Sequence, residues 1–177
     1  MEKILDKPPP YNNSKQTKIE IDDILEKQRI VTQEQILEMK EELYIYSIIQ
    51  RFNVNEYEYH VIQNIINDDL NPIIIELKSK YNRVRPYILD KRIKPLITKP
   101  LHPSYPSGHA TQCYFIAYIM SDKYPHNRKK YFYEADKIAI NREYAGFHYE
   151  SDTQFGKYIA SVVSNYFINH GNPLFNH

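Results

Sequence analysis

The sequence has one cysteine, four glycines and no tryptophan among its 177 residues. A single cysteine, Cys113, excludes an intrachain disulfide framework and a cysteine-based zinc site. The shortage of glycine argues against a turn-rich β-sandwich. The length suits one domain, which is long enough to bury a substantial core.

Neither sign of charge is in excess, since 23 Lys and Arg residues face 22 Asp and Glu residues. A basic field that would recruit nucleic acid is therefore missing, and we expect no nucleic-acid partner. No stretch approaches the roughly 20 apolar residues that span a bilayer. The N-terminus also lacks the apolar core of a signal peptide. We therefore expect a soluble, cytoplasmic protein with no membrane span.

The first 16 residues are polar and proline-rich, and we interpret 1–16 as a flexible arm before a domain at 17–177. Pro8, Pro9, Pro10 and Tyr11 match the short ligand of WW domains. Four residues are a weak signal, so a plain disordered tail is the preferred interpretation. Tyrosine-rich helix faces can pack internally or against another subunit, so a homo-oligomer also stays open.

Apolar residues recur at helical spacing through the first half of the chain. A short helix is predicted over 18–29. Capping boxes at Thr32 with Gln35, and at Asn55 with Glu58, open two more helices. The first of these carries one stripe formed by Ile36, Met39, Leu43, Tyr46 and Ile49. Asn71 followed by Pro72 predicts an N-cap and first-turn proline of a helix ending near Asn82.

The second half begins with a proline-rich segment, 86–106, which predicts an ordered loop. Helices are then predicted from Ser107 to about Lys123, from about His126 to Ala145, and from about His148 to His170. We find no strand pattern, repeat or glycine-rich phosphate loop. The sequence therefore predicts an all-α, single-domain bundle of about six or seven helices, with any site between core helices.

One cation, one imidazole and one carboxylate lie close together in the stretch from Arg142 through His148 to Asp152. If Gly146 ends one helix and another begins just after it, His148 and Asp152 share a helical face. The carboxylate would then hold one ring nitrogen as a donor and leave the other free to attack. A surface salt-bridge cluster is the alternative for this stretch taken alone.

Two further stretches carry matching chemistry. Lys78 and Arg85 are seven residues apart, about two helical turns, so they should point the same way, unless they form only a solvated helix edge. Pro106, Ser107, Gly108 and His109 form a turn into a helix, whose first N–H groups are unpaired. Glycine permits close approach of a ligand, and the helix end is electropositive. The alternative is a simple helix start with a solvent-facing histidine.

The three stretches together describe a site for a tetrahedral oxyanion. Three cations and the helix start would hold it, one imidazole would attack, and another would protonate the departing oxygen. Phosphate is the expected oxyanion because arginine forks match its oxygens.

Lys78-x6-Arg85-Pro86, Pro106-Ser107-Gly108-His109 and Arg142-x5-His148-x3-Asp152 occur in order. This arrangement resembles the tripartite signature of the type 2 phosphatidic acid phosphatase superfamily, which also holds class A acid phosphatases and vanadium-dependent haloperoxidases. The resemblance covers about residues 70–165. It is closest to soluble class A acid phosphatase-like members. One departure is Asn141, where the third motif usually has serine, and it affects fine positioning.

The resemblance implies an acid phosphatase-like hydrolase that acts on a small phosphorylated substrate without a metal ion or another cofactor. It implies that His148 attacks phosphorus and forms a phosphohistidine, that Asp152 sets its tautomer, and that His109 is the general acid and base. The phosphoryl oxygens would be held by Lys78, Arg85, Arg142, Ser107 and the backbone near Gly108. We expect substrate binding and protonation of His109 to be coupled, which favours acidic to neutral pH.

Two alternatives remain. The run from His102 to Gln112 also resembles vanadium bromoperoxidases, in which the residue matching His148 coordinates vanadium in a vanadate cofactor. His102 could be an additional acid–base group in that case. A non-catalytic phosphate-binding or adaptor protein is the less favoured alternative, because an adaptor would need only the cations. The identity of the leaving group is open.

Overall fold

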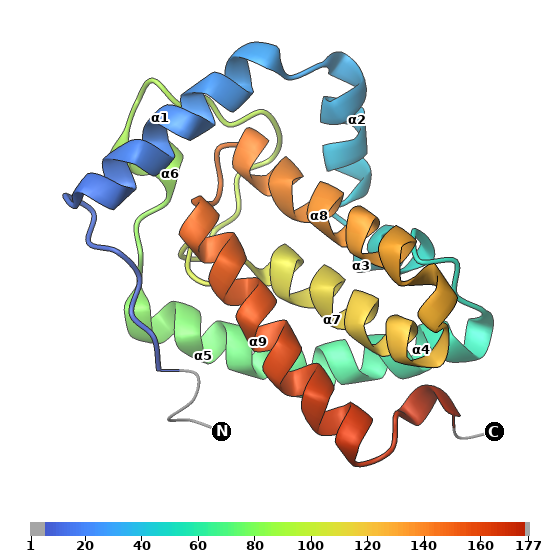
Figure 1. Ribbon diagram of the computed structural model, residues 1–177. Helices are drawn as coiled ribbons and strands as arrows, with labels where there is room; N and C mark the ends of the chain where they lie inside the picture. Colours follow the sequence, from blue (N-terminus) through green and yellow to red (C-terminus); the bar gives the residue numbers. More distant parts are fainter. Residues whose placement is uncertain (1–5, 176–177) are drawn as a thin grey trace.

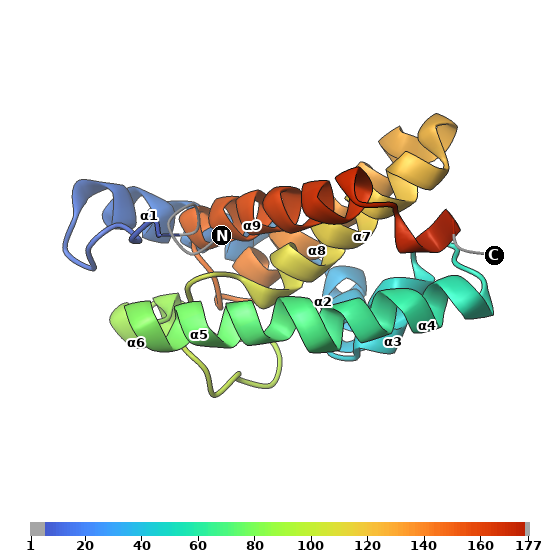
Figure 2. The ribbon, with the colours of Figure 1, turned by 90° about the horizontal axis from the view of Figure 1, so that it is seen from below.

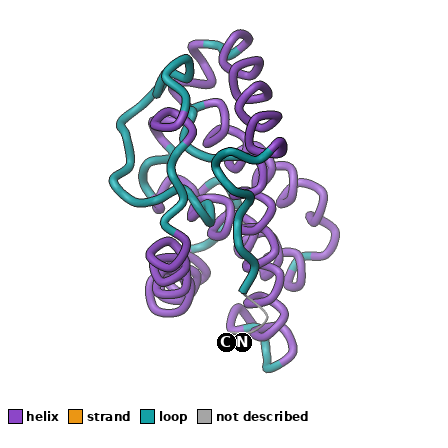
Figure 3. Tube along the Cα trace, turned by 90° about the vertical axis from the view of Figure 1, so that its left-hand side faces the viewer, coloured by secondary structure: helices purple, strands orange, loops and turns teal. Residues whose placement is uncertain are grey.

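The computed structural model describes residues 6–175, and every regular element in that range is a helix (Figures 1 and 3). The predicted all-α fold is confirmed. The α-helices are α1 Lys15–Ile30, α2 Gln33–Glu41, α3 Ile45–Gln50, α4 Glu56–Ile65, α5 Asn71–Tyr81, α6 Pro86–Leu89, α7 Gly108–Lys123, α8 Arg128–Tyr144 and α9 Glu150–Asn169. Short 3₁₀ turns occupy Pro125–Asn127 and Pro173–Phe175, and a π-helical turn occupies Ile66–Leu70.

Helix α7 is the centre of the molecule and packs against both α8 and α9 (Figure 1). Helices α4 and α5, joined by the π-turn, form one long rod on the opposite side of α7 (Figure 2). Helices α1 and α2 lie along the outer side of α8.

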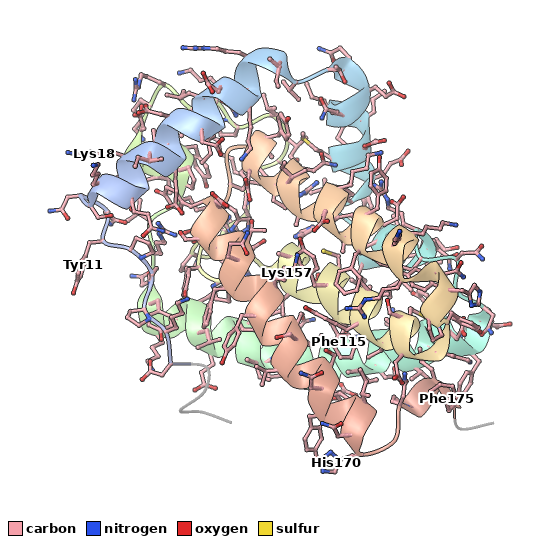
Figure 4. The ribbon with its side chains drawn as sticks, viewed as in Figure 1. Tyr11, Lys18, Phe115, Lys157, His170 and Phe175 are labelled. Carbon is pink, nitrogen blue, oxygen red and sulfur yellow. The ribbon has the colours of Figure 1, made fainter. Side chains whose placement is uncertain are left out.

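The residues of α7 explain its central place. Ala110, Cys113 and Ala117 are fully buried, and these small side chains let neighbouring helices approach closely. Phe115 is also fully buried and lies in the interior (Figure 4). These small residues of α7 are therefore part of the core.

The helix starts predicted at Thr32, Asn55 and Ser107 are confirmed. Thr32 and Asn55 each accept a bond from the backbone three residues on, and Gln35 and Glu58 bond back to complete two capping boxes. Ser107 caps α7 by accepting from the backbone N–H of Ala110. Capping is local in sequence, so a short pattern is enough to locate it.

One predicted helix was wrong, and a second was wrong only in its N-cap. The stripe from Ile36 to Ile49 does not lie on one helix, because α2 ends at Glu41 and α3 begins at Ile45. Leu43 and Tyr46 are 42% and 58% exposed as a result. The helix predicted to end near Asn82 is α5, with Pro72 in its first turn, but the expected N-cap Asn71 has helical angles inside the α4–α5 rod. The π-turn just before Pro72 changes the hydrogen-bond register there, where proline lacks an N–H.

The proline-rich segment 86–106 contains the single turn α6 and is otherwise irregular, close to the expected ordered loop. Within residues 6–175, none of the helices combines the length and the apolar character needed to cross a lipid bilayer.

The described part of the N-terminal arm contacts the domain. Asp6 forms an ion pair with Lys80, and the carbonyl of Lys7 accepts a bond from the Tyr105 hydroxyl. Tyr11 is 83% exposed at the edge of the molecule (Figure 4). The flexibility of the arm, the WW contact through Pro8–Tyr11 and the homo-oligomer remain predictions.

Candidate active site

The three sequence motifs meet at one cavity of about 540 Å³. The predicted site residues that line it are Lys78, Arg85, Gly108, His109, Arg142 and His148. The remaining wall is formed by Leu43, Tyr44, Thr98, Lys99, Pro100, His102 and Phe147. Ser107 and Asp152 do not line the cavity, and both are fully buried. A larger cavity of about 830 Å³ beside the N-terminal arm contains none of the predicted site residues.

The connection between α8 and α9 carries His148. Gly146 follows the end of α8 with a φ of +78°, a backbone conformation that favours glycine. His148 lies before α9, which begins at Glu150, so His148 and Asp152 do not share a helical face as predicted. The two side chains meet because the carboxylate of Asp152, in the first turn of α9, points back toward His148. Its Oδ2 lies 3.2 Å from His148 Nδ1 and accepts from the Tyr149 N–H at 3.0 Å.

The imidazole of His148 is buried, and this burial lowers its pKa to about 3. The hydrogen bond that His148 donates to Asp152 opposes that shift, while the charges of Arg85 and Lys78 add to it. His148 is therefore neutral at ordinary pH. Because a carboxylate can only accept, Nδ1 carries the proton and Nε2 carries the lone pair. Nε2 lies 3.4 Å from Nη1 of Arg85.

Arg83 is a site residue that the sequence reasoning missed. Its Nη1 donates to Oδ1 of Asp152 at 2.6 Å, and its Nη2 lies 3.2 Å from Oε2 of Glu20 in α1. Although burial raises the pKa of Asp152, His148 and Arg83 outweigh it and hold that pKa below its usual value. An additional arginine inside the first motif was the only signal available.

Lys78 and Arg85 both line the cavity, but not for the predicted reason. Helix α5 ends at Tyr81, and Asn82 has a left-handed backbone, so Arg85 is not two turns further along that helix. Both cations are held by carbonyls of the loop before α7. Lys78 Nζ donates to the carbonyl of Pro103 at 2.7 Å, and Arg85 Nη2 donates to the same carbonyl at 3.2 Å.

These two cations are buried beside each other, and no carboxylate within residues 6–175 forms an ion pair with either of them. Burial, and then the charge of Arg85, lowers the pKa of Lys78 to about 7. Burial also lowers the pKa of Arg85 to about 10. An anion in the cavity would favour the charged form of both side chains.

His109 lies in the first turn of α7, and its Nε2 is 2.9 Å from the backbone carbonyl of Glu42. Burial lowers its pKa well below the usual value, and the nearby Arg142, His148 and Lys78 lower it further. The free protein therefore holds a neutral His109. The predicted coupling between anion binding and protonation of His109 fits these charges.

Arg142 reaches the cavity from α8 and is only 1% exposed. Its Nη2 donates to Oε2 of Glu42 at 2.5 Å. The unusual Asn141 also contacts Glu42, since its Nδ2 donates to Oε1 at 2.8 Å. Sequence reasoning missed Glu42, because one glutamate in a charged helix end carries no distinguishing pattern.

His102 lines the cavity wall with an exposed side chain, and its carbonyl accepts from Arg85 Nε at 2.6 Å. Across residues 6–175, no group of three or more His, Cys, Asp or Glu side chains is arranged to hold a metal ion.

The fold and site define a class of protein in which helices enclose a cation-lined cavity with two histidines. Residues 61–172 match the model of the PAP2 superfamily, and the chain belongs to that superfamily. This confirms the resemblance seen in the three motifs.

Two curated relatives are similar to the chain. A non-specific acid phosphatase of Providencia stuartii is 27% identical over 122 residues, which cover 66% of this chain and 48% of the relative. A non-specific acid phosphatase of Salmonella typhi is 25% identical over 108 residues, which cover 59% and 43% respectively. The chain spans about half the length of the curated relatives it matches.

Proposed function

We propose that this protein is a phosphomonoester hydrolase that works through a phosphohistidine intermediate without a metal ion. The observation that carries the proposal is the state of His148, a buried neutral imidazole whose Nδ1 is held by Asp152. Its unprotonated Nε2 belongs to a residue that lines the cation-rich cavity. The superfamily and the two acid phosphatase relatives support this reaction class.

Substrate binding would place the phosphoryl oxygens between Lys78, Arg85 and Arg142. All three cations are buried, so a phosphate dianion would offset the repulsion among them. The start of α7 at Gly108 would add backbone N–H donors. Ser107 accepts a bond from Ala110 and still has its own hydroxyl proton to donate.

In the first half-reaction, Nε2 of His148 attacks phosphorus and the bond from phosphorus to the ester oxygen breaks. The ring becomes cationic, and the buried carboxylate of Asp152 stabilises it. His109, protonated in the bound complex, gives its proton to the departing oxygen.

In the second half-reaction, the now neutral His109 accepts a proton from water as the water oxygen attacks phosphorus. The bond between phosphorus and nitrogen breaks, which releases phosphate and returns His148 to its neutral state. A cavity of about 540 Å³ suits a small phosphorylated substrate.

The proposal is tested with an aryl phosphate on the wild type, on His148→Ala and on His126→Ala. His126 lies on the Pro125–Asn127 turn, is exposed and does not line the cavity, so His126→Ala is the matched control. Hydrolysis should disappear only in His148→Ala, and vanadate should inhibit the wild type. Quenching with labelled substrate should trap a phosphoenzyme that is acid-labile and base-stable.

Hydrolysis that survives in His148→Ala would sink the phosphohistidine mechanism. The vanadium haloperoxidase alternative makes the opposite prediction, namely that vanadate activates the protein. Bromination by peroxide and bromide after vanadate loading, faster than ester hydrolysis, would replace the proposed function with that alternative.

A further inference from the structure

Glu42 belongs to the part of the chain before residue 61, where the superfamily match begins. It lies just after the end of α2 and is 1% exposed. Helix α2 packs beside α8, the helix that carries Arg142 (Figure 1). A carboxylate this deeply buried needs charged or hydrogen-bonding partners.

The Glu42 carboxylate has three donors. Nη2 of Arg142 lies 2.5 Å from Oε2, and Oε1 accepts from Asn141 at 2.8 Å and from Arg51 at 2.7 Å. Both carboxylate oxygens are therefore occupied by the protein. Glu42 is not available as a proton donor or nucleophile, and its effect must pass through its neighbours.

These bonds use only part of the donor capacity of the Arg142 guanidinium. Nη2 is used by Glu42 and by the carbonyl of Met39 at 3.1 Å. Nε is buried and has no hydrogen-bond partner among the described residues. A buried N–H without an acceptor is costly, and a bound oxyanion would supply that acceptor. Glu42 thus holds Nη2 of Arg142, while Nε is left without a protein acceptor.

The main chain of Glu42 makes a second connection to the site. Its carbonyl lies 2.9 Å from Nε2 of His109. A carbonyl only accepts, so Nε2 carries a hydrogen, and Nδ1 is the nitrogen left to exchange a proton with substrate.

We propose that Glu42 is a positioning residue of this site, which orients Arg142 through its carboxylate and His109 through its carbonyl. The inference rests on the proposed phosphatase function. It also gives Asn141 a role, because Asn141 holds Glu42 in place. The segment before residue 61 is then required to complete the site.

The test uses Glu42→Gln, Glu42→Asp and the control Glu41→Gln. Glu41 is the neighbouring glutamate, is exposed and has no side-chain bond in the described structure. In Glu42→Gln, we expect the inhibition constant of inorganic phosphate and the KM of an aryl phosphate to rise about tenfold, because Arg142 loses its charged anchor. Glu41→Gln should match the wild type.

The pH profile separates positioning from a general loss of folded protein. The charged or titratable groups that face His109 are Arg142, His148 and Lys78. Without the Glu42 charge, Arg142 acts on His109 uncompensated, so the alkaline limb of the kcat profile should move to lower pH in Glu42→Gln. Glu42→Asp keeps the charge and should leave that limb in place, while its shorter side chain weakens phosphate binding about threefold. A purely structural role would move neither the limb nor the inhibition constant.

Unchanged or tighter phosphate inhibition in Glu42→Gln would overturn the inference. If Glu42→Gln does not fold, Glu42→Asp is the deciding variant. Unchanged affinity of Glu42→Asp for phosphate would likewise overturn the inference. The proposed function would fail separately, if the wild-type protein folds but has no phosphatase activity. Calorimetric binding of phosphate to the same variants then still tests Glu42.

Discussion

Nη1 of Arg83 lies 2.6 Å from Oδ1 of Asp152, and both side chains are almost completely buried. Asp152 in turn contacts His148, while Arg83 also contacts Glu20 of α1. A continuous chain of charged groups therefore connects an outer helix to the proposed nucleophile. Removing one member leaves a buried charge without its partner, which is strongly destabilising.

Arg83→Gln should lower both activity and stability. We expect kcat to fall about 10- to 100-fold, because Asp152 no longer holds the His148 ring as firmly. KM should change little, because Arg83 does not line the site cavity. The free energy of unfolding should drop by roughly 3–5 kcal/mol, the usual cost of breaking a buried pair. Steady-state kinetics and urea unfolding measure these effects, with the exposed Arg29→Gln as control.

The same variant has a defined pH signature. Arg83 helps to lower the pKa of Asp152 in the folded protein. The ionised carboxylate therefore stabilises the fold at pH values above its unfolded-state pKa. This contribution is lost as the pH falls through its folded-state pKa. In Arg83→Gln the folded pKa rises, so acid inactivation should begin at a higher pH than in the wild type. If acid inactivation of Arg83→Gln begins at the same pH as in the wild type, Arg83 does not control the pKa of Asp152.

Lys78 should make anion binding depend on pH near neutrality. Its pKa of about 7 means that its charge is lost as pH rises through that value, while Arg85, with a pKa of about 10, stays charged. Sulfate keeps its own charge across this range and is the suitable probe. Its affinity should weaken above about pH 7, by up to about tenfold per pH unit.

Lys78→Met should flatten this dependence and weaken sulfate binding below pH 7, whereas the exposed Lys80→Met should not. The titration of Lys78 has the opposite effect on folding stability from its effect on sulfate binding. Because the folded pKa of Lys78 is lowered, the unfolded chain binds more protons above about pH 7, and this residue alone makes stability rise with pH there. Sulfate binding that is independent of pH in the wild type would contradict the assignment.

Gly156 should be required for the close contact between α9 and the start of α7. A Cβ at this position would lie 2.8 Å from the Ser107 carbonyl oxygen and 3.1 Å from the Ala110 Cβ. The first contact is with backbone and cannot be relieved by a rotamer change. Gly156→Ala should therefore cost about 1–3 kcal/mol and displace the turn that carries His109, which lowers kcat.

Thermal unfolding and kinetics of Gly156→Ala measure both effects, and Gly171→Ala is the comparison. Gly171 has a positive φ of +96° but open space around it, so its substitution introduces strain without a clash. Full activity in Gly156→Ala would show that the α7–α9 contact tolerates a shift.

Much of the fold could be predicted because its signals are local. The boxes at Thr32 and Asn55, and the cap at Ser107, each depend on residues within one turn. The errors came from positions where distant contacts outweigh local pattern. The stripe through Leu43 predicted one continuous helix, but the chain turns there, where Glu42 faces inward to Arg142 and Asn141.

The sequence by itself determined the all-α architecture and the three motifs that carry Lys78, His109 and His148, because helical periodicity and short motif spacings depend on neighbouring residues. Only the tertiary structure decided how these groups are held. Arg83 and Asp152 are 69 positions apart, and Glu42 and Arg142 are 100 positions apart. No local pattern reports such pairs, because burial of a charge in the fold selects its partner from whatever element lies beside it.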